Sequence, residues 1–244
     1  MQGARGVSLS YKLPPGPADR ALSTLNRRHL LPSLHSDGKL VVAAYAVRAL
    51  DYGFLSVFLG VYVSLLGLTA LQAGLVFSGI MAGGALSNVV AVWKGDTIGR
   101  RRMLVAMSAL MALGGVLFPL APSATLLAVV GLFAMSTTTG GDRTAFMSLD
   151  MTILTQTSDA GQRTLVFSWY NLVGVVAKAA GTAFIALPPL LQTWLDMGEL
   201  SSFKVMLGGY AVIASAGIVI YARLSPGVER GPAGPPPREP GPEA

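Results

Sequence analysis

The chain has 244 residues, of which 52% are hydrophobic and 12% are charged. A soluble domain carries about 25% charged residues, so this composition excludes an ordinary soluble fold and predicts a membrane protein. The sequence contains no cysteine, which excludes a disulfide framework and a cysteine nucleophile. The net charge of +6 is concentrated at expected helix ends and in the tails, as in a membrane protein, and argues against a nucleic-acid partner.

Residues 1–39 are expected to be a basic, largely disordered leader in the cytoplasm. They contain scattered prolines and arginines and lack the short apolar stretch of a secretory signal. An alternative remains for residues 21–34, where leucines alternate with basic residues. That segment could lie on an anionic membrane surface.

Residues 40–223 contain six apolar segments, and about 20 helical residues are enough to cross a membrane. The sequence therefore predicts a bundle of six transmembrane helices. The expected spans are 40–68, 71–93, 103–121, a fourth that starts near 124 and becomes polar early, 165–188 and 203–222.

The basic residues between the expected spans predict the orientation. The 94–102 loop, a polar stretch over 150–163 and the segment after 222 all carry Lys or Arg, whereas the other three loops carry none. Basic loops stay on the cytoplasmic side, so both termini are expected in the cytoplasm of a multi-pass protein of a cell membrane. Residues 224–244, rich in Pro and Gly, are expected to form a disordered cytoplasmic tail.

Ionisable residues inside spans cost about 2.5–3.5 kcal/mol each and mark functional candidates. Arg48 and Asp51 are three residues apart, so they share a helix face and could pair. Asp142 and Arg143 follow two glycines in the fourth span. Each pair can be interpreted in two ways: as a neutralised ion pair near the cytoplasmic interface, or as part of the lining of a solute cavity.

Lys178 lies near the middle of the fifth span, about 13 residues past its start and seven residues after Asn171. It is too far from the membrane surface for its ammonium group to reach water easily, so it is expected to face a wet cavity or a carboxylate. The aspartates Asp51, Asp142 and Asp150 are all possible partners.

Enzymatic chemistry has little support in the sequence. Both histidines, His29 and His35, fall in the leader, so neither a Ser-His dyad nor a histidine metal site is expected within the bundle. No catalytic residue, metal site or cofactor is predicted.

The loop between the second and third spans carries a specific motif. It contains the pattern D-x-x-G-R-R-R, and this loop resembles the signature that the major facilitator superfamily has at the same place. Thr97 and Val92 depart from that signature. The resemblance implies that the motif is a cytoplasmic gate, and that its aspartate meets a second half of the protein. Its residues here are Gly95, Asp96, Gly99, Arg100, Arg101 and Arg102.

The start of the fifth span is similar to the same superfamily, through the pattern R-x-x-x-F-x-x-Y-N-x-x-G over residues 163–174. The resemblance covers about residues 40–223. It implies an inverted 3+3 repeat of helices and a substrate cavity at the bilayer midplane between two six-helix halves. Helices 1, 4 and 5 of the first half would help to line that cavity.

The expected function is therefore secondary active transport of a small solute by alternating access, with this chain as an N-terminal half. It would need a separate C-terminal half or a second copy of itself. Arg48, Arg143 and Lys178 favour an anionic or carboxylate-bearing solute. The alternative is a membrane scaffold or a decayed transporter remnant that does not transport.

Overall fold

The structure, a computed structural model, describes residues 34–134 and 145–229, and these ranges contain helices and no strands. The calls on residues 1–33 and 230–244 lie outside the described residues. The elements are α2 (Ser36–Leu65), α3 (Ala70–Ile98), α4 (Arg100–Leu117), η2 (Phe118–Leu120), α5 (Ala124–Ala134), α6 (Ala145–Thr157), η3 (Ala160–Gln162), α7 (Arg163–Ala183), η4 (Phe184–Ala186), α8 (Leu187–Leu195), α9 (Glu199–Ala222) and η5 (Pro226–Glu229).

Five helical segments in the described part are long and apolar enough to cross a membrane. They are α2, most of α3, α4 with η2, α7 continued through α8, and α9. The expected fourth span is represented by α5, which has 11 residues and is therefore about 17 Å long, roughly half of a hydrocarbon core. Residues 135–144, which follow α5, lie outside the described residues. The fold is thus an all-α membrane fold with five candidate spans.

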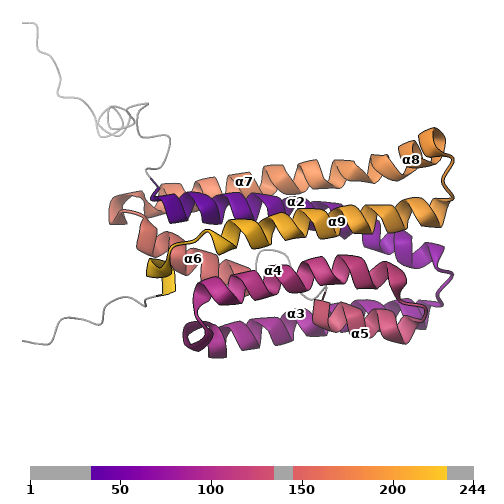
Figure 1. The fold of residues 1–244 in the computed structure, drawn as a ribbon, viewed down its shortest axis with the longest axis horizontal. Coiled ribbons are helices and arrows are strands. Elements are labelled where there is room, and N and C mark those ends of the chain that lie inside the picture. Colours follow the sequence, from indigo (N-terminus) through magenta and orange to yellow (C-terminus); the bar gives the residue numbers. More distant parts are fainter. Residues whose placement is uncertain (1–33, 135–144, 230–244) are drawn as a thin grey trace, which may run out of the picture. The chain divides into compact units, whose positions relative to one another are not determined.

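The connections gather at two ends of the helices (Figure 1). The start of α2, the turn between α3 and α4, the α6–α7 connection and η5 lie at one end. The connections α2–α3, α4–α5 and α8–α9 lie at the other. We call the first the basic end, because most described lysines and arginines lie there: Lys39, Lys94, Arg100, Arg101, Arg102, Arg163 and Arg223.

Helix α2 is the central element of the described fold. It packs along α7 and α9 and also contacts α6, while α3 packs on α5, and α4 packs on α9 and α5. The middle of α2 is buried on nearly every side, from Arg48 to Leu55. A helix in this position must be apolar all round, and any polar residue on it needs a partner within the protein.

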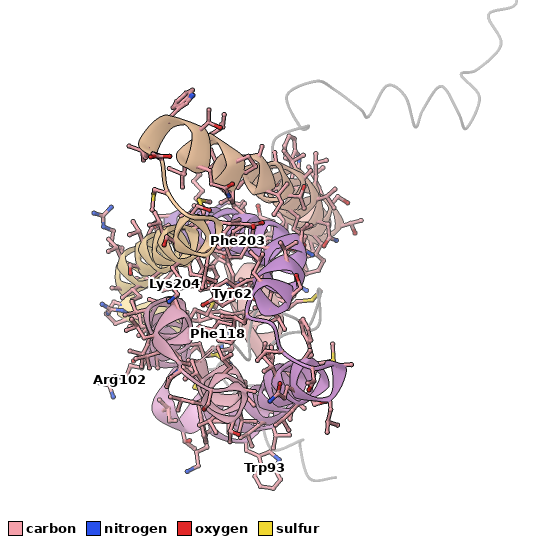
Figure 2. The ribbon with its side chains drawn as sticks, turned by 90° about the vertical axis from the view of Figure 1, so that its right-hand side faces the viewer. Tyr62, Trp93, Arg102, Phe118, Phe203 and Lys204 are labelled. Atoms are coloured by element: carbon pink, nitrogen blue, oxygen red, sulfur yellow. The ribbon has the colours of Figure 1, made fainter. Side chains whose placement is uncertain are left out.

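Aromatic side chains fill the core near the end opposite the basic end. Phe58 stacks on Phe203 with ring centroids 4.6 Å apart, and Tyr62 contacts Phe118 at 6.0 Å. Figure 2 shows Tyr62, Phe118 and Phe203 meeting between their helices. Rings from α2, η2 and α9 therefore close this end of the core by packing, without charged groups.

The outer surface carries large apolar side chains, among them Val92, Val176 and Val212 on three different helices. Two tryptophans are especially exposed, Trp93 at 80% near the basic end and Trp194 at 79% near the opposite end. Figure 2 shows Trp93 pointing away from the helices. Tryptophans at both ends of an apolar surface are typical of the two membrane–water interfaces.

Candidate functional site

The site is built on a close contact between α2 and α7. A Cβ atom added to Gly53 would lie 2.0 Å from the Lys178 carbonyl oxygen, and one added to Gly181 would lie 2.0 Å from the Leu50 carbonyl oxygen. These glycines therefore let the two backbones touch, as small residues do in membrane helices. Gly174 extends this α2–α7 seam toward the basic end, where it makes room for the ring of Tyr45.

Replacing Gly53 by alanine is expected to separate the helices, because the new methyl group meets backbone that cannot rotate away. We expect a loss of stability of about 1–3 kcal/mol, as for other overpacked contacts. Thermal unfolding in detergent measures it. The matched control on the same helix is Gly60→Ala, since a Cβ there meets nothing within 4 Å. Equal unfolding midpoints for the two variants would contradict a backbone contact at the seam.

A buried charge network lies beside the seam, toward the basic end. Arg48 Nη2 donates to Asp150 Oδ2 at 2.7 Å, and Tyr170 donates to the same oxygen at 2.9 Å. Tyr221 accepts from Arg48 Nη1 and donates to Asp150 Oδ1 at 3.2 Å. Arg48 and Asp150 are 4% and 0% exposed in their side chains. We call these four residues the Arg48 network; it joins α2, α6, α7 and α9.

Aromatic rings enclose the guanidinium group of this network. The Arg48 guanidinium carbon lies 4.2 Å from the centroid of Phe146 and 5.2 Å from that of Tyr45. Tyr45 in turn stacks on Tyr170, with centroids 3.8 Å apart. Cation–π contacts of this kind strengthen when water is excluded. The network is thus a hydrogen-bonded unit without net charge, in which the positive charge of Arg48 is balanced by the Asp150 carboxylate and contacted by aromatic rings.

The structure corrects two expectations about charges. Arg48 pairs with Asp150, and not with Asp51 on its own helix, although the spacing of Arg48 and Asp51 permits a pair. Asp150 does not lie in a polar loop. It is within α6 and fully buried. The sequence suggests Asp150 as a partner for Lys178, but its carboxylate is bound by Arg48, Tyr170 and Tyr221.

Helix α7 presents a row of polar side chains beside the seam, since Lys178 lies four residues after Gly174 and three before Gly181. Its residues follow one another at intervals of three, four or seven, so they share a face. Ser168 and Asn171 are exposed, and Lys178 is half-buried. We call this surface the α7 polar face; it consists of Thr164, Ser168, Asn171, Lys178 and Thr182. Asn171 and Lys178, two of the site residues predicted from the sequence, therefore share this face two turns apart, separate from the Arg48 network.

The start of α7 borders an open hollow of about 500 Å³ at the basic end. Its lining comes from α6 and from the beginning of α7, and includes Thr152, Thr155, Gln156 and Arg163. The hollow therefore lies at the basic end of α7, beside Arg163. The predicted site residues Asp142 and Arg143 lie outside the described residues.

The arginine motif forms the turn between α3 and α4. Gly99 separates the two helices with φ of +96°, a value that favours glycine. Arg100 is buried, and Arg102 points away from the helices in Figure 2. Arg101 donates to the carbonyl oxygen of Ala222 at the end of α9. Gly95 packs near Leu149 of α6, and Asp96 lies in the last turn of α3.

The segment after α9 is folded against the basic end, which differs from the disordered tail expected from residue 224. Ser225 donates its N–H and its hydroxyl to the Asp37 carboxylate, at 3.0 and 2.5 Å. Leu224 and Val228 are buried. The Glu229 side chain lies beside Gly99. We call residues 224–229 the strap. Its buried apolar side chains and its hydrogen bonds to Asp37 hold it in place, although its Pro and Gly content favours disorder.

Ser225→Ala is expected to loosen the strap, because it removes a hydrogen bond to a charged carboxylate, worth about 1.5–3 kcal/mol. Trypsin should then cleave after the exposed Arg223 roughly ten times faster or more, since 1.4 kcal/mol corresponds to about tenfold. Limited proteolysis in detergent gives the rate. Ser201→Ala, at an exposed position of α9, is the control and should leave the rate unchanged, and an unchanged rate in Ser225→Ala would show that this bond does not hold the strap.

The described fold defines a class of protein. Five apolar helices of spanning length, an apolar outer surface and a charge network kept inside are the properties of a polytopic α-helical integral membrane protein.

Comparison with known proteins gives the family. The model of the Major Facilitator Superfamily matches residues 41–243, and the chain belongs to this superfamily. An uncharacterized membrane protein of Saccharomyces cerevisiae is 29% identical over 195 residues, which are 79% of this chain and 44% of that protein. The chain thus spans less than half the length of this relative. No solved structure matches the chain.

Proposed function

We propose that the chain forms the N-terminal half of a secondary active transporter that moves a small solute by alternating access. A second six-helix half, from another polypeptide segment or from a second copy of this chain, completes the carrier. The family is one of membrane transporters, which makes transport the first expectation. The observation that carries the proposal is the α7 polar face.

The polar face supports transport because of where it lies. Ser168 and Asn171 are exposed on a helix of spanning length, and Lys178 on the same face is half-buried. Polar and charged groups do not face hydrocarbon; they face a water-filled cavity or another protein segment. An aqueous path along α7, beginning at the hollow near Arg163, satisfies these groups.

The packing of the helices supports an inverted 3+3 repeat. In such a repeat α2, α3 and α4 correspond to the fourth span, α7 and α9. If each helix is replaced by its counterpart (α2 by α5, α3 by α7, α4 by α9, and the reverse), the contact between α2 and α7 becomes the contact between α5 and α3. In the same way the contact between α2 and α9 becomes that between α5 and α4, and the contact between α4 and α9 maps onto itself. All five of these contacts occur in the described fold. The proposal therefore takes α5 and the residues after it as the fourth span, giving six.

The charge distribution supports the proposed orientation. The basic end carries the arginine motif, Arg163 and Arg223, whereas the opposite end carries Lys204 alone among the described lysines and arginines. The positive-inside rule then puts the basic end in the cytoplasm. The arginine motif and the strap meet there, and we propose that Asp96 in this motif contacts the second half as part of a cytoplasmic gate.

The proposed solute is small and anionic or carboxylate-bearing. Arg48 is unsuited to bind it, because its charge is already compensated by Asp150. Asp51 is also unsuited, because an acidic side chain does not attract an anion. Lys178 and Asn171 are the remaining described candidates, a cation and an amide one above the other on the α7 polar face.

Uptake by proteoliposomes tests the function. The chain is reconstituted alone and together with candidate second halves, and a panel of radiolabelled organic anions is offered with and without an imposed proton gradient. Solute accumulation supports transport, and Lys178→Ala should then weaken solute binding at least tenfold. Ser201→Ala, on an exposed part of α9, is the control. Absence of uptake in every combination would favour a scaffold or a remnant, and binding unchanged by Lys178→Ala would refute the solute assignment.

A further inference from the structure

A second buried acid lies on α2, one turn beyond Arg48. Asp51 is 0% exposed. It borders a cavity of about 10 Å³ between α2, α4 and α9, and a cavity of this size has room for about one water molecule. The walls are mainly small or apolar: Ala44, Val47, Ser108, Met111, Ala214 and Gly217. No residue of α6 or α7 lines it.

The carboxyl group of Asp51 has no protein partner in the described residues. Neither of its oxygens accepts a hydrogen bond from them. Ser108, the hydroxyl that shares the cavity, donates to the Leu104 carbonyl oxygen of its own helix. Arg48 lines the same cavity, but its Nη2 group is committed to Asp150, and its Nε–H also lacks a partner there.

The titratable neighbours of Asp51 do not neutralise a negative charge. From α2 they are Arg48, which is paired with Asp150, and Tyr52. From α9 they are Tyr210, which interacts electrostatically with Asp51, and Tyr221, which is bonded within the Arg48 network. The cavity residues from α4 are Ser108 and Met111, neither of them charged. An ionised carboxylate without a cation or hydrogen-bond donors is very unfavourable in such a place, and the group avoids that cost by holding a proton.

We propose that Asp51 is a buried proton-binding site, in which the neutral carboxyl group and the Arg48 Nε–H share one water molecule in this cavity. A metal cation does not fit as the ligand, because Na⁺-like or divalent ions need several oxygen ligands, and the cavity offers one carboxyl group and little space. The proton site is separate from the α7 polar face. It does not depend on the proposed transport function, so either can fail without the other.

Infrared spectroscopy tests the proton directly. A neutral carboxyl group has a carbonyl stretching band apart from those of carboxylates and amides. At about pH 7.5 carboxylic acids in contact with water are ionised and do not contribute to that band. We expect the purified chain to show the band, Asp51→Asn to lose it, and Asp159→Asn, at an exposed position, to keep it. A spectrum without the band, or a band that survives in Asp51→Asn, would overturn the proposal.

A second variant tests the water and does not touch the acid. A Cβ at Gly217 would lie 3.5 Å from Ser108 Oγ, an ordinary contact, so Gly217→Ala can fold while its methyl group fills the cavity. Loss of the water should shift the Asp51 carbonyl band to higher frequency, because the carbonyl loses a hydrogen bond. Gly209→Ala, on the same helix with nothing within 4 Å of its Cβ, is the control. An unshifted band in Gly217→Ala would refute the shared water.

Discussion

Asp150→Ala is expected to be the most destabilising single substitution that this fold offers to a polar residue. Removing the carboxylate leaves the buried Arg48 guanidinium without its counter-charge and deprives Tyr170 and Tyr221 of an acceptor. Breaking a buried ion pair by removing one partner costs about 3–5 kcal/mol. The expected result is a large fall in the thermal unfolding midpoint in detergent, together with a low yield of folded protein.

A double variant separates the charge from the packing. Arg48→Met combined with Asp150→Leu replaces the ion pair by apolar groups of similar volume, a change that is often neutral or stabilising elsewhere. We expect it to recover most of the stability that Asp150→Ala loses. If Asp150→Ala unfolds at the same temperature as the unsubstituted chain, the pair does not hold α6 against α2. Glu229→Ala, at the end of the strap, serves as a control for removing a carboxylate from a less buried site.

Single cysteines along α7 are expected to divide sharply by their reactivity. The sequence has no cysteine of its own, so each substitution introduces one reporter thiol. In the native membrane, a water-soluble maleimide should label Ser168→Cys and Asn171→Cys rapidly, because thiols react as thiolates, which form in water and not in hydrocarbon. The same reagent should leave Val176→Cys, on the apolar side of α7, essentially unlabelled. We expect rates that differ by a factor of about 10² or more.

Val176 is the matched control for this measurement. Val176 is 60% exposed in the described fold, so the three positions differ in the medium that they face and not in how far they protrude. Val212→Cys on α9, also well exposed, adds a control on another helix. Similar slow labelling at all four positions would show that the α7 polar face is not open to water.

The sequence was sufficient for the features that depend on local composition. The apolar segments expected at 40–68, 71–93, 103–121, 165–188 and 203–222 correspond to the five candidate spans, with boundaries that differ by a few residues. Long apolar runs make such spans readable because the bilayer requires about 20 apolar residues whatever the fold. The fourth span is harder to recognise, since its sequence becomes polar from Ser136 onward.

The charge network could not be read from the sequence in the same way. Arg48 and Asp150 are 102 residues apart, and their pairing depends on how α6 packs against α2. Tyr170 and Tyr221 were missed because tyrosines in apolar helices usually serve packing or the interface. One signal was present: Asp150 stands between Phe146 and Leu154 in a mostly apolar stretch, which is unusual for the polar loop expected there.

The α2–α7 seam has a mechanical consequence. Where backbone rests on backbone, as at Gly53 and Gly181, there is no flexible side chain to absorb a displacement between two helices. Two helices in such contact move together as one rigid body, so a displacement at one end is transmitted to the other end. A displacement at the basic end, near Tyr45, would therefore be accompanied by motion at the opposite end of the pair, near Phe58. The two glycines therefore couple the motion of α2 to that of α7.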